Sequence, residues 1–174
     1  MCGIIGCVSE KDCCGALYDG LKRLEYRGYD SAGIAVLGEK LSVCKKKGGV
    51  SALSCFFAQG NTGIGHTRWA THGAPSDTNA HPHRAGKIVL VHNGIAENFS
   101  ALKAELEGAG ERFYSETDTE VIAKLISRAY RGDLLSAVKE GLSRVEGSYA
   151  VAVIAEDSQG EVVAAKYNSP LVAG

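Results

Sequence analysis

The chain begins MCGIIGCV at residues 1–8, a short apolar run with a cysteine directly after the initiator methionine. Such a run predicts a buried strand. Removal of the methionine leaves Cys2 with both a thiol and a free α-amine, whose pKa of about 7.7–8.0 suits it to accept the thiol proton. Taken alone, Cys2 is better explained as a small buried thiol at the start of a strand.

The composition is that of an ordinary globular domain. Of 174 residues, 45% are hydrophobic, and 19 Lys and Arg residues face 20 Asp and Glu residues, for a formal net charge of −1. A chain of this length buries roughly 70% of the surface that its unfolded form exposes, which is enough for one core. We expect no nucleic-acid partner and no membrane partner, because binding to either one requires a strongly basic face and the charges of this chain are nearly balanced.

We expect a cytoplasmic protein. A signal peptide has basic residues before its apolar segment, and none precedes the apolar run here. No segment reaches the length of a membrane span. The six cysteines lack a secretory context and are expected to be reduced; they lie at positions 2, 7, 13, 14, 44 and 55. The apolar end at residues 169–174 indicates a chain cut from a longer one.

Strand patterns cluster at both ends of the chain with helical patterns between them, which favours a layered α+β domain over a parallel βαβ array. We expect strands over residues 2–8, 31–37, 41–46, 62–68, 87–92, 149–155 and 161–167. The first helix follows a capping box formed by Ser9 and Asp12 and ends by Gly28. Further helices are expected over residues 50–58, 97–108, 118–131 and 133–145, with Thr117 and Glu120 as a second capping box.

A long loop at residues 69–86 separates two of the expected strands. It holds two of the three prolines and shows no period, and long loops inside compact domains are usually functional. All five histidines fall at or near it, at positions 66, 72, 81, 83 and 92. Their spacing matches no zinc signature, so we expect no metal and favour orienting and hydrogen-bonding imidazoles, some of them structural.

Three further sites each allow a functional and an ordinary explanation. Asn93-Gly94, where the strand at 87–92 is expected to stop, is a plain turn or a pair of oxyanion donors. Arg68, followed by Trp69, is a surface cation or a partner for a carboxylate. Asp118 is an acid in the first turn of a helix, where the dipole stabilises it, or a binding residue. Neither a nucleophile elbow of serine hydrolases nor a P-loop occurs in the sequence.

Six segments together resemble the glutaminase domains of the glucosamine-6-phosphate synthase family. They are MCGIIG at 1–6, RLEYRGYDSAG at 23–33, HTRWATHG at 66–73, NAHPH at 79–83, VHNG at 91–94 and SETDTE at 115–120. The first and fifth are shared by class II glutamine amidotransferases in general, and the second and third are specific to this member of the class. The resemblance covers essentially the whole chain, residues 1–174.

The resemblance implies a fold and a reaction. The fold is the four-layer αββα sandwich of the N-terminal nucleophile hydrolases, and the reaction converts L-glutamine and water to L-glutamate and ammonia. Cys2 attacks the side-chain amide, its α-amine takes the thiol proton, and Asn93 Nδ2 with the Gly94 N–H holds the oxyanion of a step that leads to a thioester. No cofactor and no metal take part.

The resemblance also assigns the binding residues. Arg68 pairs with the substrate α-carboxylate and Asp118 with its α-ammonium. The pocket wall and support consist of Trp69, Thr71, His72 and His81, and Arg27 and Gly28 brace the nucleophile. In the parent chain, C-terminal sugar-isomerase domains, absent here, use the ammonia to convert D-fructose 6-phosphate to D-glucosamine 6-phosphate.

Two alternatives stay open. Within the enzyme class, the glutaminase domains of amidophosphoribosyltransferase and asparagine synthetase share the nucleophile but differ in the middle segments. From another class, a non-catalytic metal- or ligand-binding module could be built on the histidine-rich loop.

Overall fold

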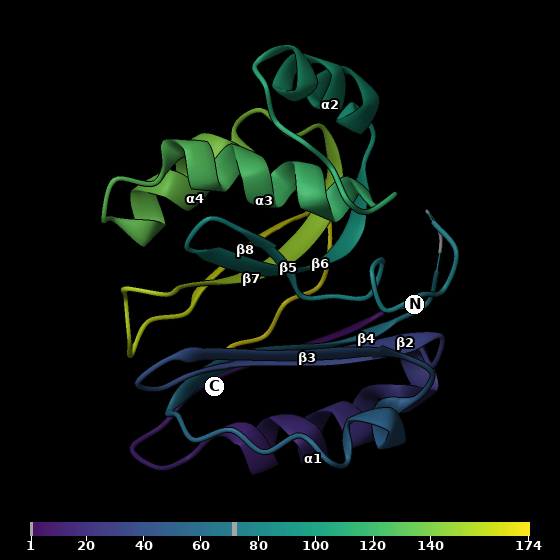
Figure 1. The fold of residues 1–174 in the computed structure, drawn as a ribbon, viewed down its shortest axis with the longest axis vertical. Helices are drawn as coiled ribbons and strands as arrows, with labels where there is room; N and C mark the ends of the chain where they lie inside the picture. Colours follow the sequence, from purple (N-terminus) through teal and green to yellow (C-terminus); the bar gives the residue numbers. More distant parts are fainter. Residues whose placement is uncertain (1, 71–72) are drawn as a thin grey trace.

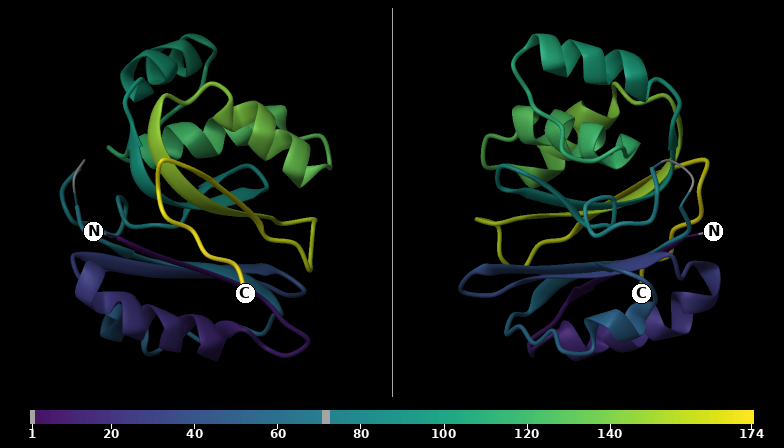
Figure 2. Two further views of the ribbon diagram at one scale, coloured as in Figure 1. Left: turned by 180° about the vertical axis from the view of Figure 1, so that it is seen from behind. Right: turned by 45° about the vertical axis from the view of Figure 1, so that its right-hand side comes forward.

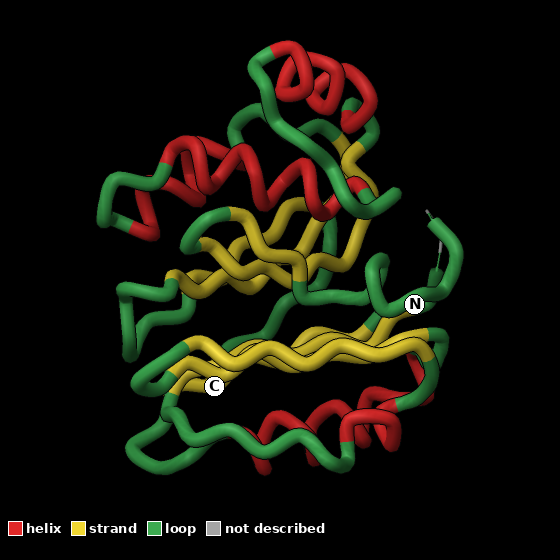
Figure 3. The backbone as a smooth tube through the Cα atoms, viewed as in Figure 1, coloured by secondary structure: helices red, strands yellow, loops and turns green. Residues whose placement is uncertain are grey.

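The computed structural model describes residues 2–70 and 73–174. Two four-stranded antiparallel sheets pack face to face, with helices on both outer faces (Figure 1). Figure 3 shows the resulting order of layers, which is helix, sheet, sheet, helix. The expected α+β sandwich is therefore confirmed. Within the described residues, no helix is long and apolar enough to span a bilayer.

The first sheet is built from the N-terminal part of the chain. Its strand order is β1-β4-β2-β3, with bounds β1 (Gly3–Val8), β2 (Ser31–Leu37), β3 (Leu41–Lys47) and β4 (Thr62–Arg68). Its outer face is covered by α1 (Cys14–Leu24) and by the short 3-10 turns η1 (Glu25–Arg27) and η2 (Val50–Leu53). Every residue of β2 and β4 is buried, because these two central strands have protein on both faces.

The second sheet is built from the rest of the chain. Its strand order is β5-β6-β7-β8, with bounds β5 (His83–Ala85), β6 (Ile88–Ala96), β7 (Gly147–Ala155) and β8 (Val163–Tyr167). Three helices lie on its outer side: α2 (Phe99–Gly108), α3 (Asp118–Ala129) and α4 (Leu134–Leu142). Both views of Figure 2 place α2 beyond the other two, so α3 and α4 cover the sheet itself.

Alternation along β6 explains how one strand serves two layers. Val89 and Val91 belong to a core between the two sheets, whereas Ile88 and Leu90 belong to the core beneath α3 and α4. Successive side chains of a strand point to opposite faces, so a continuous apolar run fills both cores. The core between the sheets consists of Ala35, Leu37, Ile64, Val89, Val91, Ala152 and Ile154.

Both expected capping boxes are wrong. Helix α1 begins only at Cys14, and its N-cap makes no side-chain hydrogen bond. The Ser9 hydroxyl instead accepts from the Lys11 N–H, and the Asp12 carboxylate accepts from the Gly60 N–H at 3.0 Å. These side chains shape the turn before the helix, because short polar side chains bond neighbouring backbone in turns as readily as at caps.

The second box fails for a different reason. Thr117 is the N-cap of α3, but its hydroxyl lies 3.0 Å from His83 Nε2. The Glu120 carboxylate turns back to accept from the N–H groups of Tyr114 and Ser115. Tertiary partners thus replace the local pairing that the spacing predicts.

Several elements also differ from the expectation. The helix expected at 50–58 is only the 3-10 turn η2, and α4 ends at Leu142. The long loop contains a short strand, β5, which the sequence pattern did not indicate. Strand β6 does not stop at Asn93-Gly94 but continues to Ala96, because β7 pairs with it along its whole length.

We predict that Gly33→Ala lowers the free energy of unfolding by about 1–3 kcal/mol. A Cβ on Gly33 would overlap the backbone oxygen of His81 and lie 2.8 Å from Lys45 Cβ. Urea denaturation measures the effect, and Gly15→Ala is the matched control. A Cβ at Gly15, which is exposed in α1, meets nothing within 4 Å, so that variant should be as stable as the parent or more so. An unchanged stability of Gly33→Ala would contradict the close packing.

Candidate active site

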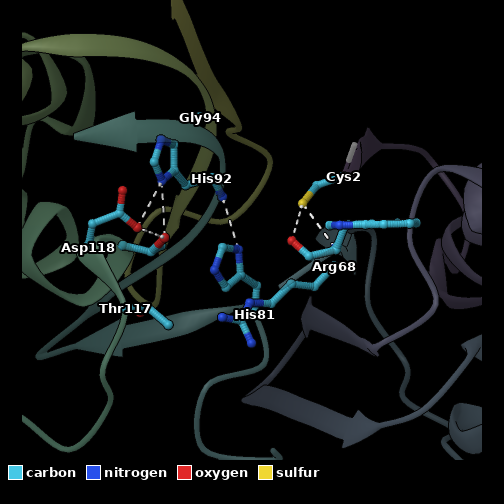
Figure 4. Close-up of a pocket in the computed structure, with 9 residues that line it drawn as sticks. Cys2, Arg68, His81, His92, Gly94, Thr117 and Asp118 are labelled. Atoms are coloured by element: carbon cyan, nitrogen blue, oxygen red, sulfur yellow. Dashed lines mark hydrogen bonds and ion pairs between the residues drawn. The ribbon is translucent and has the colours of Figure 1, made fainter. Parts of the chain in front are cut away.

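A small pocket lies where both sheets and the start of α3 come together (Figure 4). Its walls are formed by Cys2, Arg68, Trp69, His81, His92, Gly94, Thr117, Asp118 and Thr119. A larger groove adjoins it at Cys2 and is lined in part by Arg27, Asn93 and residues 169–172. The structure thus brings most of the residues singled out from the sequence to one place.

Strand pairing positions the nucleophile candidate. Strand β1 runs antiparallel to β4, with Gly3 opposite Thr67, so Cys2 lies beside Arg68 at the end of β4. The Cys2 Sγ accepts a hydrogen bond from the Trp69 N–H at 3.2 Å. Burial raises the pKa of the Cys2 thiol, although the Trp69 N–H and the Arg68 charge partly offset it. The resting thiol is therefore protonated at neutral pH and needs a base to become a nucleophile.

The backbone of Cys2 is held from two sides. Its carbonyl oxygen accepts from Arg27 Nε at 3.2 Å and from Asn93 Nδ2 at 3.1 Å. Arg27 belongs to the η1 turn beneath the first sheet, whereas Asn93 belongs to β6 of the second sheet. The position of Cys2 thus depends on both sheets.

Gly28 and Asp30 hold the backbone that carries Arg68 and Trp69. A Cβ on Gly28 would lie 2.7 Å from the Arg68 carbonyl carbon, a distance that only glycine permits. The Asp30 N–H donates to the Arg68 oxygen at 3.1 Å, and its carboxylate accepts from the Ala70 N–H at 2.9 Å. Asp30 was not among the site residues predicted from the sequence, although it lies within the RLEYRGYDSAG segment.

Asn93 and Gly94 are not a turn. Both lie within the β6 ladder, opposite Ala150 and Tyr149 of β7. Gly94 has a φ of 141°, and a Cβ there would overlap the backbone oxygen of Ser148. Glycine is required because the strand is distorted here, at the wall of the pocket.

Two buried charges of opposite sign belong to the pocket. Arg68 donates from Nη2 to the Gly73 oxygen at 3.0 Å, and burial lowers the pKa of its guanidinium, which nevertheless stays charged. Asp118 opens α3, and its carboxylate accepts from the Ala96 N–H at 2.9 Å. In Figure 4, Asp118 and Cys2 lie on opposite sides of His81.

Four of the histidines are buried and uncharged. Burial lowers the pKa of His66 and of His83 to about 3, and it also lowers the pKa values of His81 and His92. Apart from the undescribed residues, no group of three or more His, Cys, Asp or Glu side chains could hold a metal ion. Imidazoles in this state act as hydrogen-bonding groups.

Three predicted wall residues remain, which are Trp69, Thr71 and His72. Trp69 is 45% exposed, and its ring meets Tyr29 edge to face at 5.6 Å, so it forms an outer wall. Thr71 and His72 lie outside the described residues. Neither His92 nor Thr119 was singled out from the sequence as a site residue. Their side chains lie 3.0 Å apart, from Nδ1 to Oγ1, and the tertiary contact of His92 with Asp118 places them in the pocket.

The arrangement offers a definite chemistry. A thiol lies beside a cation, an anion lies across the pocket, and a side-chain amide contacts the backbone of the thiol residue. Such a pocket is complementary to a zwitterion that presents a carbonyl carbon to sulfur.

The sequence matches proteins of known type. Residues 66–169 match a family described as Glutamine amidotransferase domain. The chain is 58% identical to glutamine–fructose-6-phosphate aminotransferase [isomerizing] of Thermus thermophilus and 52% identical to the protein of the same name in Caulobacter vibrioides. Each alignment covers 100% of this chain, which spans about 30% of the length of these relatives.

Solved structures give the same picture of the fold. Glutamine phosphoribosylpyrophosphate amidotransferase of B. subtilis superposes with a TM-score of 0.80 at 31% identity, over 94% of this chain and 36% of that one. A structure described as the allosteric regulatory enzyme of purine biosynthesis gives 0.79 at 33% identity, over 88% and 35%.

We predict that acid destabilises this protein through its buried histidines. His66 and His83 have pKa values of about 3 when folded and of about 6.5 when unfolded, so between these pH values only the unfolded chain takes up the protons. The free energy of unfolding should fall as the pH drops below about 6.5, by up to about 1.4 kcal/mol per pH unit for each histidine. Urea denaturation between pH 7 and 4 measures this slope.

The variant His83→Gln removes one titrating ring and should make that slope shallower by about 1.4 kcal/mol per pH unit. A stability that does not change between pH 7 and 5 would contradict the neutral, buried state of these rings.

Proposed function

Because this chain belongs to the class II glutamine amidotransferase family, we propose that it hydrolyses L-glutamine to L-glutamate and ammonia. The observation that carries the proposal is the meeting of Cys2, Arg68 and Asp118 in one small pocket. A thiol alone could take part in many reactions, but a thiol in a pocket that also holds a buried cation and a buried carboxylate suits the amide of an amino acid.

The chemistry proceeds in two halves. With Met1 removed, the α-amine of Cys2 accepts the thiol proton as Sγ attacks the side-chain amide carbon of glutamine. Asn93 Nδ2 and the Gly94 N–H stabilise the oxyanion, and the proton passes to the leaving nitrogen, which departs as ammonia. Water then attacks the γ-glutamyl thioester, releases glutamate and restores the thiol.

The remaining residues bind and support. Arg68 holds the substrate α-carboxylate and Asp118 its α-ammonium, so a ligand without the amino-acid head group lacks both charge-assisted contacts and binds more weakly. The pocket wall comprises Trp69, Thr71, His72 and His81, and Arg27 and Gly28 brace Cys2. The hydrogen bond from Arg27 to the Cys2 carbonyl and the tight packing of Gly28 against Arg68 support the bracing role.

We extend the proposal to the parent protein. The domain occupies residues 1–174 and supplies ammonia to C-terminal sugar-isomerase domains, which convert D-fructose 6-phosphate to D-glucosamine 6-phosphate. The 58% identity with an aminotransferase named for this substrate supports this parent over the phosphoribosylpyrophosphate enzyme, at 31%. All six cysteines lie in the described part of the chain with free thiols, which supports a cytoplasmic location.

We predict that glutamine hydrolysis requires Cys2 at the true N-terminus. Cys2→Ala should abolish turnover, because no other group replaces the sulfur nucleophile. Cys44→Ala, the matched control on β3, should retain it. Protein that keeps Met1 should also be inactive, because the α-amine is then a peptide nitrogen without basicity.

Glutamate release, read beside the intact mass of the same sample, measures both effects. Turnover by Cys2→Ala, or full activity with Met1 still attached, would refute the assignment of nucleophile and base.

We predict that Arg68→Lys raises KM for glutamine roughly tenfold, with a smaller fall in kcat. Lysine keeps the charge but loses the planar pair of donors that matches a carboxylate. Arg84→Lys makes the same exchange in an exposed ion pair with Glu156 and should leave both constants unchanged. Steady-state kinetics distinguish the two variants, and an unaltered KM in Arg68→Lys would remove Arg68 from the substrate site.

A further inference from the structure

His66 lies in β4 beneath the nucleophile, and none of the roles proposed so far uses it. Its ring is fully buried. Its Nε2 lies 2.9 Å from Asn93 Oδ1 and 3.1 Å from the backbone oxygen of His92. One nitrogen of the ring therefore faces two oxygens at the point where β4 of the first sheet meets β6 of the second.

Two backbone carbonyls fix the direction of every hydrogen bond in this chain of contacts. The His92 oxygen can only accept, so His66 Nε2 must carry a hydrogen. The Cys2 oxygen can likewise only accept, so the atom of Asn93 that lies 3.1 Å from it must be the amide nitrogen. The side-chain oxygen of Asn93 then faces His66 and shares its Nε2–H.

The other side of the ring agrees with this tautomer. His66 Nδ1 is buried and has no hydrogen-bond partner among residues 2–70 and 73–174. Burying Nδ1 without a hydrogen costs less than burying it as an N–H, because a buried N–H without an acceptor is rare. The His81 ring, 4.1 Å away between centroids, limits rotation of the imidazole. Burial lowers the pKa of His66 to about 3, so the ring keeps one N–H at neutral pH.

We propose that His66 is a positioning residue, which keeps the side-chain amide of Asn93 turned so that its nitrogen faces the nucleophile. The inference rests on the proposed function, in which Asn93 Nδ2 donates to the oxyanion. One hydrogen of that nitrogen bonds the Cys2 carbonyl, and the second is available to the substrate oxygen.

The orientation matters because the two ends of an amide have opposite character. A rotated Asn93 would place a lone pair, rather than an N–H, where negative charge develops, and repulsion would replace stabilisation. The charge appears only in the transition state. Loss of His66 should therefore lower kcat and leave KM nearly unchanged.

A matched pair of substitutions isolates the donor. His66→Gln keeps an N–H near the position of Nε2, whereas His66→Met has a similar shape and no donor. We expect kcat for glutamine hydrolysis to fall about tenfold or more in His66→Met, with KM within about twofold, and to recover in His66→Gln. Thermal unfolding of both variants shows whether they are equally folded. A fall of less than tenfold in His66→Met, or an equal fall in His66→Gln, would overturn the inference.

A double-mutant cycle tests whether His66 acts through Asn93. Asn93→Ala should lower kcat by about 10²–10³, as for the loss of one oxyanion donor. Adding His66→Met to Asn93→Ala should have no further effect, because the amide that His66 orients is gone. A second fall as large as the first would assign His66 a general structural role and refute positioning.

The tautomer supplies a readout that does not depend on activity. Nitrogen-15 NMR of the wild-type chain should show His66 as the neutral Nε2–H form, and the Nδ1–H form would overturn the inference even in an active protein. If the wild type shows the Nε2–H form but releases no glutamate from glutamine, the proposed function fails instead. Should His66→Met not fold, this measurement decides the question.

Discussion

The apolar contact between the two sheets holds the pocket together. Val89 and Val91 of β6 pack against Ala35 and Ile64 of the first sheet, and this contact fixes the distance between the ends of β4 and β6. Cys2 and Arg68 belong to the first sheet, whereas Gly94 belongs to β6 of the second sheet and Asp118 to α3, which covers that sheet. Neither half forms the pocket alone, so burial between the sheets sets the geometry of the chemistry.

Polar contacts cross the same boundary and make it specific. A line of hydrogen bonds runs from His66 on β4 to Asn93 on β6 and back to the Cys2 carbonyl. Under the proposed function, a bound glutamine would add a further contact across this boundary, because its carboxylate would meet Arg68 of the first sheet and its ammonium would meet Asp118 of α3. Burial of the apolar core brings the two sheets together, and these directional hydrogen bonds fix the orientation of the side chains between them.

The sequence predicted most of the strands well, because they depend on local signals, and most of the described residues that it singled out lie together around the pocket. Alternation and β-rich runs located β2, β4 and β7 closely, and the motif around Cys2 predicted a nucleophile at the residue that now lies at the pocket. The failures share one cause, which is tertiary contact. Asn93-Gly94 has the local pattern of a turn, yet pairing with β7 keeps it in a strand. Thr117 is the N-cap of α3, as predicted, but its hydroxyl contacts His83 and forms no capping box with Glu120.

The burial of Cys2 also bears on its chemical lifetime in the cell. Because burial raises the pKa of the thiol, the resting protein holds little thiolate, and thiolate is the form that peroxides and electrophiles attack. Under the proposed function, a sulfur that ionises only as it meets its substrate is protected between turnovers. The same partial burial that delays ionisation therefore also slows oxidation of the thiol.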